Sequence, residues 1–152
     1  APEKIQSRGY SGAGGAGITL ELQSTPKMLT SLCDTWCPDA MVVSFKLETN
    51  PNILVAKAAG AIRRYGVDVV CANVLGTHRR LVTLISRDLA AALSAHPIII
   101  HKEGPIDGSE DTVIAVTGVR EERLELEAGS GETIEQPLVE ALYALHSRFL
   151  EL

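Results

Sequence analysis

Two apolar runs with a helical pattern between them occupy the centre of the chain. Met41 to Leu47 is nearly continuous in apolar character, which predicts a strand buried on both faces of a parallel sheet. Asn50-Pro51 then opens a helix whose apolar residues recur at helical spacing as far as Gly66, which is placed to stop it. Val67 to Ala72 is the next apolar run. Together they predict a β-α-β unit with a nucleotide-sized crevice at its strand ends.

Further elements are predicted on both sides of this unit. Thr25-Pro26 starts a helix that Pro38 ends, and a strong closing helix runs from Ile134 to Leu150. Other patterns predict strands at 18–22, 80–86, 98–100, 112–116 and 123–126, a helix at 88–95, and a mobile segment at 102–111. The predicted fold class is α/β, a Rossmann-like three-layer sandwich with a mostly parallel sheet and an added antiparallel edge. We expect a single domain over residues 1–152, with an irregular insertion at 97–133.

Composition narrows the class of protein. With 152 residues, 45% of them hydrophobic, the chain can build one core and is too short for two ordinary domains. A net charge of −5 argues against a nucleic-acid-binding surface. The apolar runs are far shorter than the roughly 20 residues of a membrane span. Three cysteines without a secretion signal predict reduced thiols in the cytoplasm, and the start at Ala1-Pro2 predicts a fragment or a processed chain.

Two motifs resemble a phosphate-binding loop and a metal site, but each has a simpler interpretation. Gly12 to Gly17 is rich in glycine, but it follows a polar segment and enters a strand, whereas a phosphate loop follows a strand and opens a helix. We therefore interpret it as a flexible turn. Cys33 and Cys37 lie one helical turn apart and could form half of a metal site. No second Cys/His pair accompanies them, so we predict no metal site.

Basic residues are concentrated in the first two β-α units of this acidic chain. A nucleoside triphosphate needs such cations, because negative charge develops on its phosphate oxygens during transfer. Each basic residue alone can equally be a solvated surface charge, but the group favours a phosphate-binding role. The group consists of Lys4, Lys27, Lys46, Lys57, Arg63 and Arg64.

Specific motifs also carry a family resemblance. Pro2-Glu-Lys-Ile5, the strand end Ser44-Phe-Lys-Leu-Glu-Thr49 and the Ala72-Asn73 strand end resemble the eukaryotic form of phosphopantothenate–cysteine ligase (phosphopantothenoylcysteine synthetase). The resemblance extends closely from Pro2 to about Arg87 and loosely over the closing helix. It implies that this chain is the C-terminal half of a longer ligase.

The resemblance assigns roles to individual residues. Lys4 falls on the catalytic lysine that approaches the triphosphate, Phe45 on the aromatic residue that contacts the base, and Asn73 on a nucleotide-contacting asparagine. The nucleotide-contacting turn at a helix start falls on Pro26, Lys27, Met28 and Leu29. Lys46, Lys57, Arg63 and Arg64 remain candidates for phosphate binding. Two lysines that bacterial members carry on the helix before the Val-Ala-Asn strand fall on Ala61 and Tyr65, where Arg63 and Arg64 lie close enough to replace them.

The activity implied by the resemblance is a step of coenzyme A biosynthesis. ATP (or CTP) activates the carboxylate of 4'-phosphopantothenate as an acyl-nucleotide, and the amine of cysteine then displaces the nucleotide. Mg²⁺ bound through the nucleotide phosphates and a homodimer are also implied. The family's pantothenate loop has no counterpart here, so we expect the chain alone to be inactive. Two alternatives stay open: a non-catalytic nucleotide-binding subunit, and a structural homologue that only pairs with another α/β chain.

Overall fold

The computed structural model describes residues 21–87, 97–103, 113–127, 129, 131 and 133–151. Four predictions concern residues wholly or mainly outside these ranges: Lys4, the Gly12–Gly17 turn, the strand at 18–22 and the helix at 88–95. The segment expected to be mobile, 102–111, lies outside them from residue 104 onward. Within the ranges, no helix is long and apolar enough to cross a membrane.

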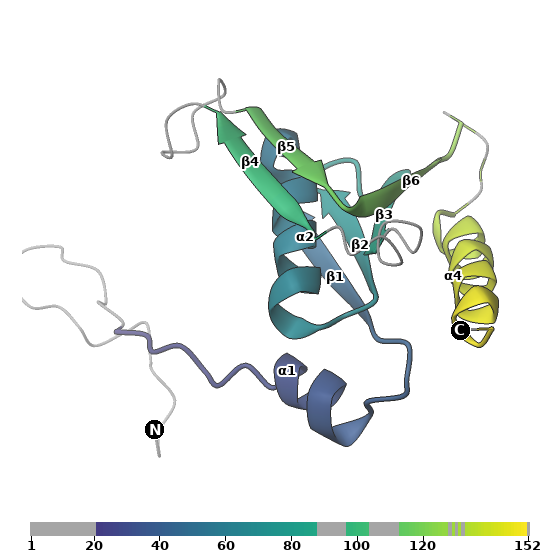
Figure 1. Cartoon of the computed structure of the whole chain (residues 1–152). Coiled ribbons are helices and arrows are strands. Elements are labelled where there is room, and N and C mark those ends of the chain that lie inside the picture. Colours follow the sequence, from purple (N-terminus) through teal and green to yellow (C-terminus); the bar gives the residue numbers. More distant parts are fainter. Residues whose placement is uncertain are drawn as a thin grey trace, which may run out of the picture.

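The described residues form helices on both sides of a mixed sheet (Figure 1). The predicted α/β class is therefore confirmed. In chain order the elements are α1 (Leu29–Ser31), a π-helical turn η1 (Leu32–Trp36), β1 (Val43–Glu48), a 3₁₀ turn η2 (Pro51–Ile53), α2 (Leu54–Tyr65), β2 (Val69–Val74), β3 (Leu81–Arg87), β4 (Ile99–Glu103), β5 (Val113–Thr117), β6 (Val119–Glu125) and α4 (Glu135–Phe149).

The main sheet has the strand order β1-β2-β3-β6, and β4 and β5 form a separate two-stranded sheet. β1 and β2 are parallel, in a register that places Val43 opposite Val69 and Leu47 opposite Asn73. The pairs β2–β3, β3–β6 and β4–β5 are all antiparallel. The expectation of a mostly parallel sheet is therefore wrong for the described strands. The chain segment between β2 and β3 is too short for a parallel crossover, which needs a dozen or more residues.

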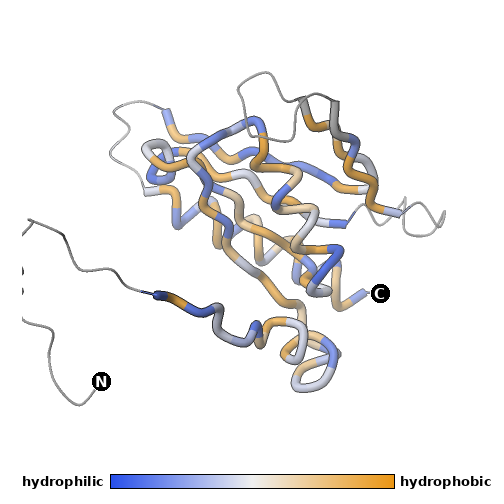
Figure 2. Tube along the Cα trace, turned by 90° about the vertical axis from the view of Figure 1, so that its left-hand side faces the viewer, coloured by the Kyte–Doolittle hydropathy of each residue, from blue (hydrophilic) through white to orange (hydrophobic). Residues whose placement is uncertain are grey.

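Two apolar clusters hold the three layers together. On one face, Ile62 and Ala58 of α2 pack with Val70 and Ile85 of the sheet, and the β4–β5 hairpin adds to this cluster. On the other face, the side chains of α4 cover a second cluster centred on Leu84, which contains Val69, Cys71, Val82, Leu126 and Ile134. Figure 2 shows the hydrophobic residues concentrated along the central strands. This arrangement matches the predicted three-layer sandwich.

The α2 helix follows local signals closely. The Asn50 side chain accepts a hydrogen bond from the Asn52 backbone N–H at 2.9 Å, which caps the turn that leads into the helix. Gly66 ends the helix with φ at 76°, and its N–H donates to the Ile62 carbonyl at 3.1 Å. By contrast, the first helix begins at Leu29 and not at Thr25, and no side chain caps it.

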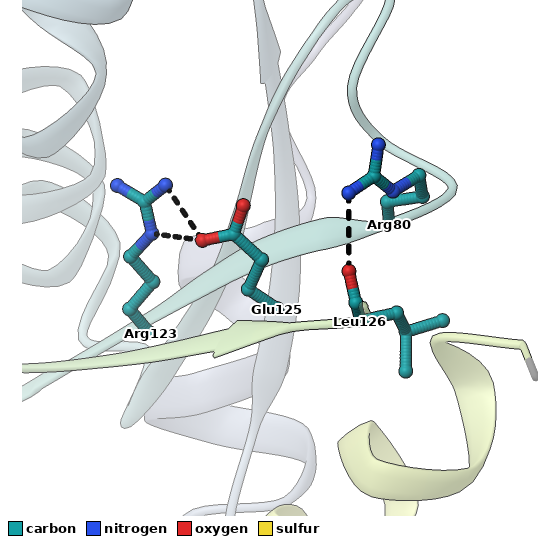
Figure 3. Close-up of polar contacts among 4 residues, drawn as sticks. All are labelled: Arg80, Arg123, Glu125 and Leu126. Carbon is teal, nitrogen blue, oxygen red and sulfur yellow. Dashed lines mark hydrogen bonds and ion pairs between the residues drawn. The ribbon is translucent and has the colours of Figure 1, made fainter. Parts of the chain in front are cut away.

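Polar contacts join the start of β3 to the end of β6, the edge strand at the other side of the sheet from β1 (Figure 3). The guanidinium of Arg80 donates to the Leu126 carbonyl at 3.2 Å, and the Leu126 N–H donates to the Arg80 carbonyl at 2.9 Å. Arg123 and Glu125 form an exposed ion pair at 2.9 Å on β6. The backbone hydrogen bond extends the β3–β6 pairing by one residue, and the bond from the Arg80 side chain holds the end of β6 against β3.

Gly118 permits the tight turn between β5 and β6. Its φ is +79°, and a Cβ there would lie 2.8 Å from the Pro97 carbonyl oxygen. We expect Gly118→Ala to lower the free energy of unfolding by about 2–3 kcal/mol, because backbone strain adds to this clash. Gly129→Ala is the matched control: φ is +83° but nothing lies within 4 Å, so about 1 kcal/mol is expected. Urea denaturation measures both values, and equal losses would contradict the role of the close approach.

Candidate functional site

Three of the predicted cationic residues surround the phenol of Tyr65. The ammonium of Lys27 donates a hydrogen bond to the Tyr65 hydroxyl at 3.1 Å and lies 5.8 Å from the ring centroid. The guanidinium carbon of Arg64 lies 5.5 Å from the same centroid. Lys46, on β1, is close enough for its charge to act on the phenol. We call Lys27, Lys46, Arg64 and Tyr65 the Tyr65 cluster.

Tertiary packing brings Lys27 to this place. The α1–η1 segment packs beside the end of α2: a Cβ at Gly66 would lie 3.6 Å from the Cβ of Cys33. Leu29, two residues after Lys27, packs against the core cluster that contains Ile62. The short segment before α1 is thereby held against the last turn of α2, and Lys27 reaches Tyr65 across 38 residues of sequence.

The electrostatics of the cluster favour an anion. The hydrogen bond from Lys27 lowers the pKa of the Tyr65 phenol; desolvation opposes this shift, and the charges of Arg64, Lys27 and Lys46 add to it. Lys46 also forms an ion pair with Glu48 at 2.9 Å. Within the described part of the chain, neither Lys27 nor Arg64 pairs with a carboxylate. The cluster therefore carries more positive charge than its neighbours neutralise.

Phe45 and Asn73 lie on adjacent parallel strands, as predicted. Val43 packs in the cluster beneath α4 together with Val69 and Cys71, so alternation along the strands places Phe45 and Asn73 on that same face. Phe45 is 72% exposed, so the expectation of a strand buried on both faces is wrong for this part of β1. β1 is an edge strand of the described sheet, and on this face of its carboxyl half Phe45 and Leu47 are both exposed.

Asn73 carries an unsatisfied polar atom. Its side-chain oxygen is buried and has no hydrogen-bond partner within the described residues. Buried polar atoms are nearly always paired, so such an atom indicates a partner beyond those residues, such as a ligand or another part of the chain. The atom stands at the carboxyl end of β2, on the face that also presents Phe45.

The structure thus divides the predicted site residues into groups. Lys27, Lys46 and Arg64 gather around Tyr65, whereas Phe45 and Asn73 share the opposite face of β1 and β2. Lys57 and Arg63 are exposed on α2 and form no hydrogen bond or ion pair with the described members of either group. The remaining members of the predicted turn lie around the start of the first helix: Pro26, Met28 and Leu29. Sequence reasoning did not identify Tyr65 as a functional residue, because its contact with Lys27 is long-range.

The cysteines occupy three different environments: Cys33 is half-buried, Cys37 is exposed and Cys71 is buried. Desolvation raises the pKa of the Cys33 thiol, with the Asp68 and Asp34 carboxylates adding to the shift, and burial raises the pKa of Cys71 to about 11. No group of three or more metal-ligating side chains occurs among the described residues.

We expect Cys71 to resist thiol reagents in the folded protein. A rise of about two pKa units lowers its thiolate fraction about 100-fold, and burial excludes the reagent as well. Mass spectrometry after timed labelling with Ellman's reagent at pH 8 measures each site. Cys37 is expected to react fast in native protein, and all three cysteines are expected to react in urea. Equal labelling rates of Cys71 in native and unfolded protein would contradict its burial.

The described part of the chain is thus an α/β unit with a cationic cluster on one face of β1 and an exposed aromatic residue on the other. The family model described as DNA/pantothenate metabolism flavoprotein C-terminal domain matches residues 2–93. The chain therefore belongs to this family. The matched range agrees with the resemblance seen in the sequence between Pro2 and Arg87.

Curated relatives support the same assignment. The chain is 45% identical over 69 residues to Phosphopantothenate–cysteine ligase 2 of Oryza sativa subsp. japonica, covering 45% of this chain and 21% of the relative. It is 39% identical over 85 residues to Phosphopantothenate–cysteine ligase of Homo sapiens, covering 56% of this chain and 25% of the relative. The matched part of the chain thus spans only a fifth to a quarter of the length of these relatives.

A solved structure shares the fold. The complex of a Cab2 mutant, H337A, with phosphopantothenate-cysteine superposes with a TM-score of 0.62 over 88% of this chain and 33% of that chain. At 23% sequence identity this likeness supports the α/β architecture alone.

Proposed function

We propose that this chain supplies the nucleotide-binding part of a ligase of coenzyme A biosynthesis. The reaction joins 4'-phosphopantothenate to cysteine through an acyl-nucleotide intermediate, with ATP (or CTP) as the co-substrate. The observation that carries the proposal is the Tyr65 cluster, where Lys27 and Arg64 meet without a carboxylate partner among the described residues. The curated relatives of the chain are named phosphopantothenate–cysteine ligases.

In this proposal, different described residues bind the phosphates and the base of the nucleotide. Lys27, Lys46 and Arg64 neutralise the phosphates, and their positive charges stabilise the charge that develops during nucleotidyl transfer. Phe45 offers an exposed ring to the base, and Asn73 offers a buried amide oxygen that lacks a partner among the described residues. The cations lie on one face of edge strand β1, and Phe45 and Asn73 lie on the opposite face of β1 and β2. A nucleotide that contacts both sets of residues therefore has to pass around that edge.

The side chains around the Tyr65 cluster fit a metal cation that is bound mainly through phosphate oxygens and has few protein ligands. Among the described residues, the carboxylate of Glu48 adjoins the cluster, and it is already paired with Lys46. Mg²⁺ usually keeps several waters and takes few protein ligands when it binds a nucleotide. When bound, it would supply further charge neutralisation at the phosphates. We also propose that the ligase is a cytoplasmic homodimer, as the family resemblance implies.

Titration calorimetry and a ligase assay test the proposal together. We expect the chain to bind ATP or CTP in the presence of Mg²⁺, and to form no phosphopantothenoylcysteine alone. Adding the N-terminal part of a relative should restore product formation. Nucleotide binding without product in the reconstituted assay would favour a non-catalytic nucleotide-binding subunit, and no nucleotide binding at all would favour a structural pairing role.

A further inference from the structure

We propose that Tyr65 is a positioning residue, whose hydroxyl and ring hold Lys27 and Arg64 in place to bind the oxygens of a polyphosphate anion. The inference deepens the proposed function, because it concerns the same cluster, and it rests on that function only for the identity of the natural ligand. The chemical class of the ligand is a chain of linked phosphates, as in a nucleoside triphosphate or inorganic tripolyphosphate.

The first step of the argument concerns the freedom of Lys27. Its side chain is exposed, and it lies before α1 in a segment without regular structure. A lysine in such a place samples many rotamers and loses that freedom when it binds an anion. The 3.1 Å hydrogen bond to the Tyr65 hydroxyl fixes its ammonium before any ligand arrives. Fixing the side chain in advance reduces the entropic cost of binding.

The second step concerns the donors that remain. An ammonium has three N–H donors, and Tyr65 uses one of them, which leaves two for phosphate oxygens. The guanidinium carbon of Arg64 lies 5.5 Å from the centroid of the Tyr65 ring, and none of the guanidinium N–H groups is hydrogen-bonded to another described residue. Both cations are therefore anchored at the same ring and still present donors outward.

The third step concerns charge. Lys27 and Arg64 approach different parts of the same side chain: the ammonium of Lys27 lies 3.1 Å from the hydroxyl oxygen, and the guanidinium carbon of Arg64 lies 5.5 Å from the ring centroid, within the range of a cation–π contact. The charge of Lys46 adds to the field at the same hydroxyl, although Glu48 offsets part of it. A multiply charged anion satisfies this arrangement better than a single carboxylate, because it can engage several cations at once.

A double-mutant cycle tests whether Tyr65 acts through Lys27. Titration calorimetry measures the binding of inorganic tripolyphosphate to the wild type, Tyr65→Phe, Lys27→Met and the double variant. The Phe variant keeps the ring and removes the hydroxyl. We expect Tyr65→Phe to weaken binding about three- to tenfold, as the loss of one hydrogen bond to a charged group implies. In the Lys27→Met background the same substitution should change the affinity by less than about 1.5-fold.

Two controls make the cycle specific. Tyr143→Phe removes the hydroxyl of a 73% exposed tyrosine on α4, and Arg148→Met removes one positive charge from the same helix. Both should leave tripolyphosphate binding unchanged, and thermal unfolding checks that every variant is folded. An equal effect of Tyr65→Phe in both backgrounds would assign Tyr65 a structural role and overturn the proposal. Unchanged binding by Tyr65→Phe would overturn it as well.

The probe separates this inference from the proposed function. If the wild-type chain does not bind tripolyphosphate, the anion site is refuted, while the ligase activity can still be demonstrated in the reconstituted assay. If tripolyphosphate binds with the expected coupling but no ligase product forms, the role of Tyr65 is upheld and the proposed function fails.

Discussion

Ile62→Ala is expected to lower the free energy of unfolding by about 2–5 kcal/mol. The side chain of Ile62 is fully buried in the cluster that joins α2 to the sheet, where it packs with Val67, Val70 and Ile85. Removing its methyl groups forfeits their transfer free energy and leaves a cavity that the surrounding layers can only partly close. Because Ile62 also occupies the last turn of α2, the same substitution should loosen the anchoring of Tyr65.

Urea denaturation followed by circular dichroism measures the loss. Ile62→Val is the conservative control and should cost about 0.5–1.5 kcal/mol, since it removes one methylene. Val139→Ala, at a 63% exposed position on α4, should stay within about 0.5 kcal/mol of the wild type. A loss at Ile62 no larger than the loss at Val139 would contradict the position of α2 on the sheet.

The elements predicted best are those with strong local signals. For α2, the sequence predicted a beginning at Asn50-Pro51 and an end at Gly66. Asn50 caps the turn that leads into the helix, and Gly66 is its C-cap. The closing helix was predicted over 134–150 and is observed at Glu135–Phe149. The first helix was predicted too early, because Thr25 and Pro26 suit a helix start but nothing in the sequence requires one there.

The direction of the strands was harder to predict. A continuous apolar run indicates burial, but it does not say whether neighbouring strands are parallel or what covers each face. β2 matches the run, since Val69 to Ala72 are all buried. In β1 the same kind of run leaves Phe45 and Leu47 exposed at an edge of the described sheet. The short connection from β2 to β3 was the available signal for an antiparallel pair.

The candidate site was predictable only in part. The sequence indicated a concentration of cations, and the structure brings Lys27, Lys46 and Arg64 together. The sequence could not indicate that Tyr65 lies among these cations. The contact between Lys27 and Tyr65 depends on how the segment before α1 packs against the end of α2. Which cations of a group meet is decided by tertiary packing, and residue type alone does not determine it.

The largest expected effect on activity comes from Lys4, which lies outside the described residues. In a ligase that contains this chain together with the further length of its relatives, Lys4→Ala should lower the single-turnover rate by about 10²–10³-fold, or roughly 3–4 kcal/mol. The family resemblance places this lysine near the triphosphate. A cation whose contact strengthens as phosphate charge develops stabilises the transition state more than the ground state. Nucleotide affinity should therefore change less than the rate.

Single-turnover kinetics, with nucleotide binding measured separately, distinguish the possible roles of Lys4. Lys4→Arg keeps the charge and should retain more of the rate than Lys4→Ala, whereas an exposed charge without a role would leave both variants near the wild type. A rate that returns to normal when the ATP concentration is raised would assign Lys4 to ground-state binding. A persistent loss at saturating nucleotide would place its contribution in the transition state, because saturation compensates only for weakened binding of the substrate.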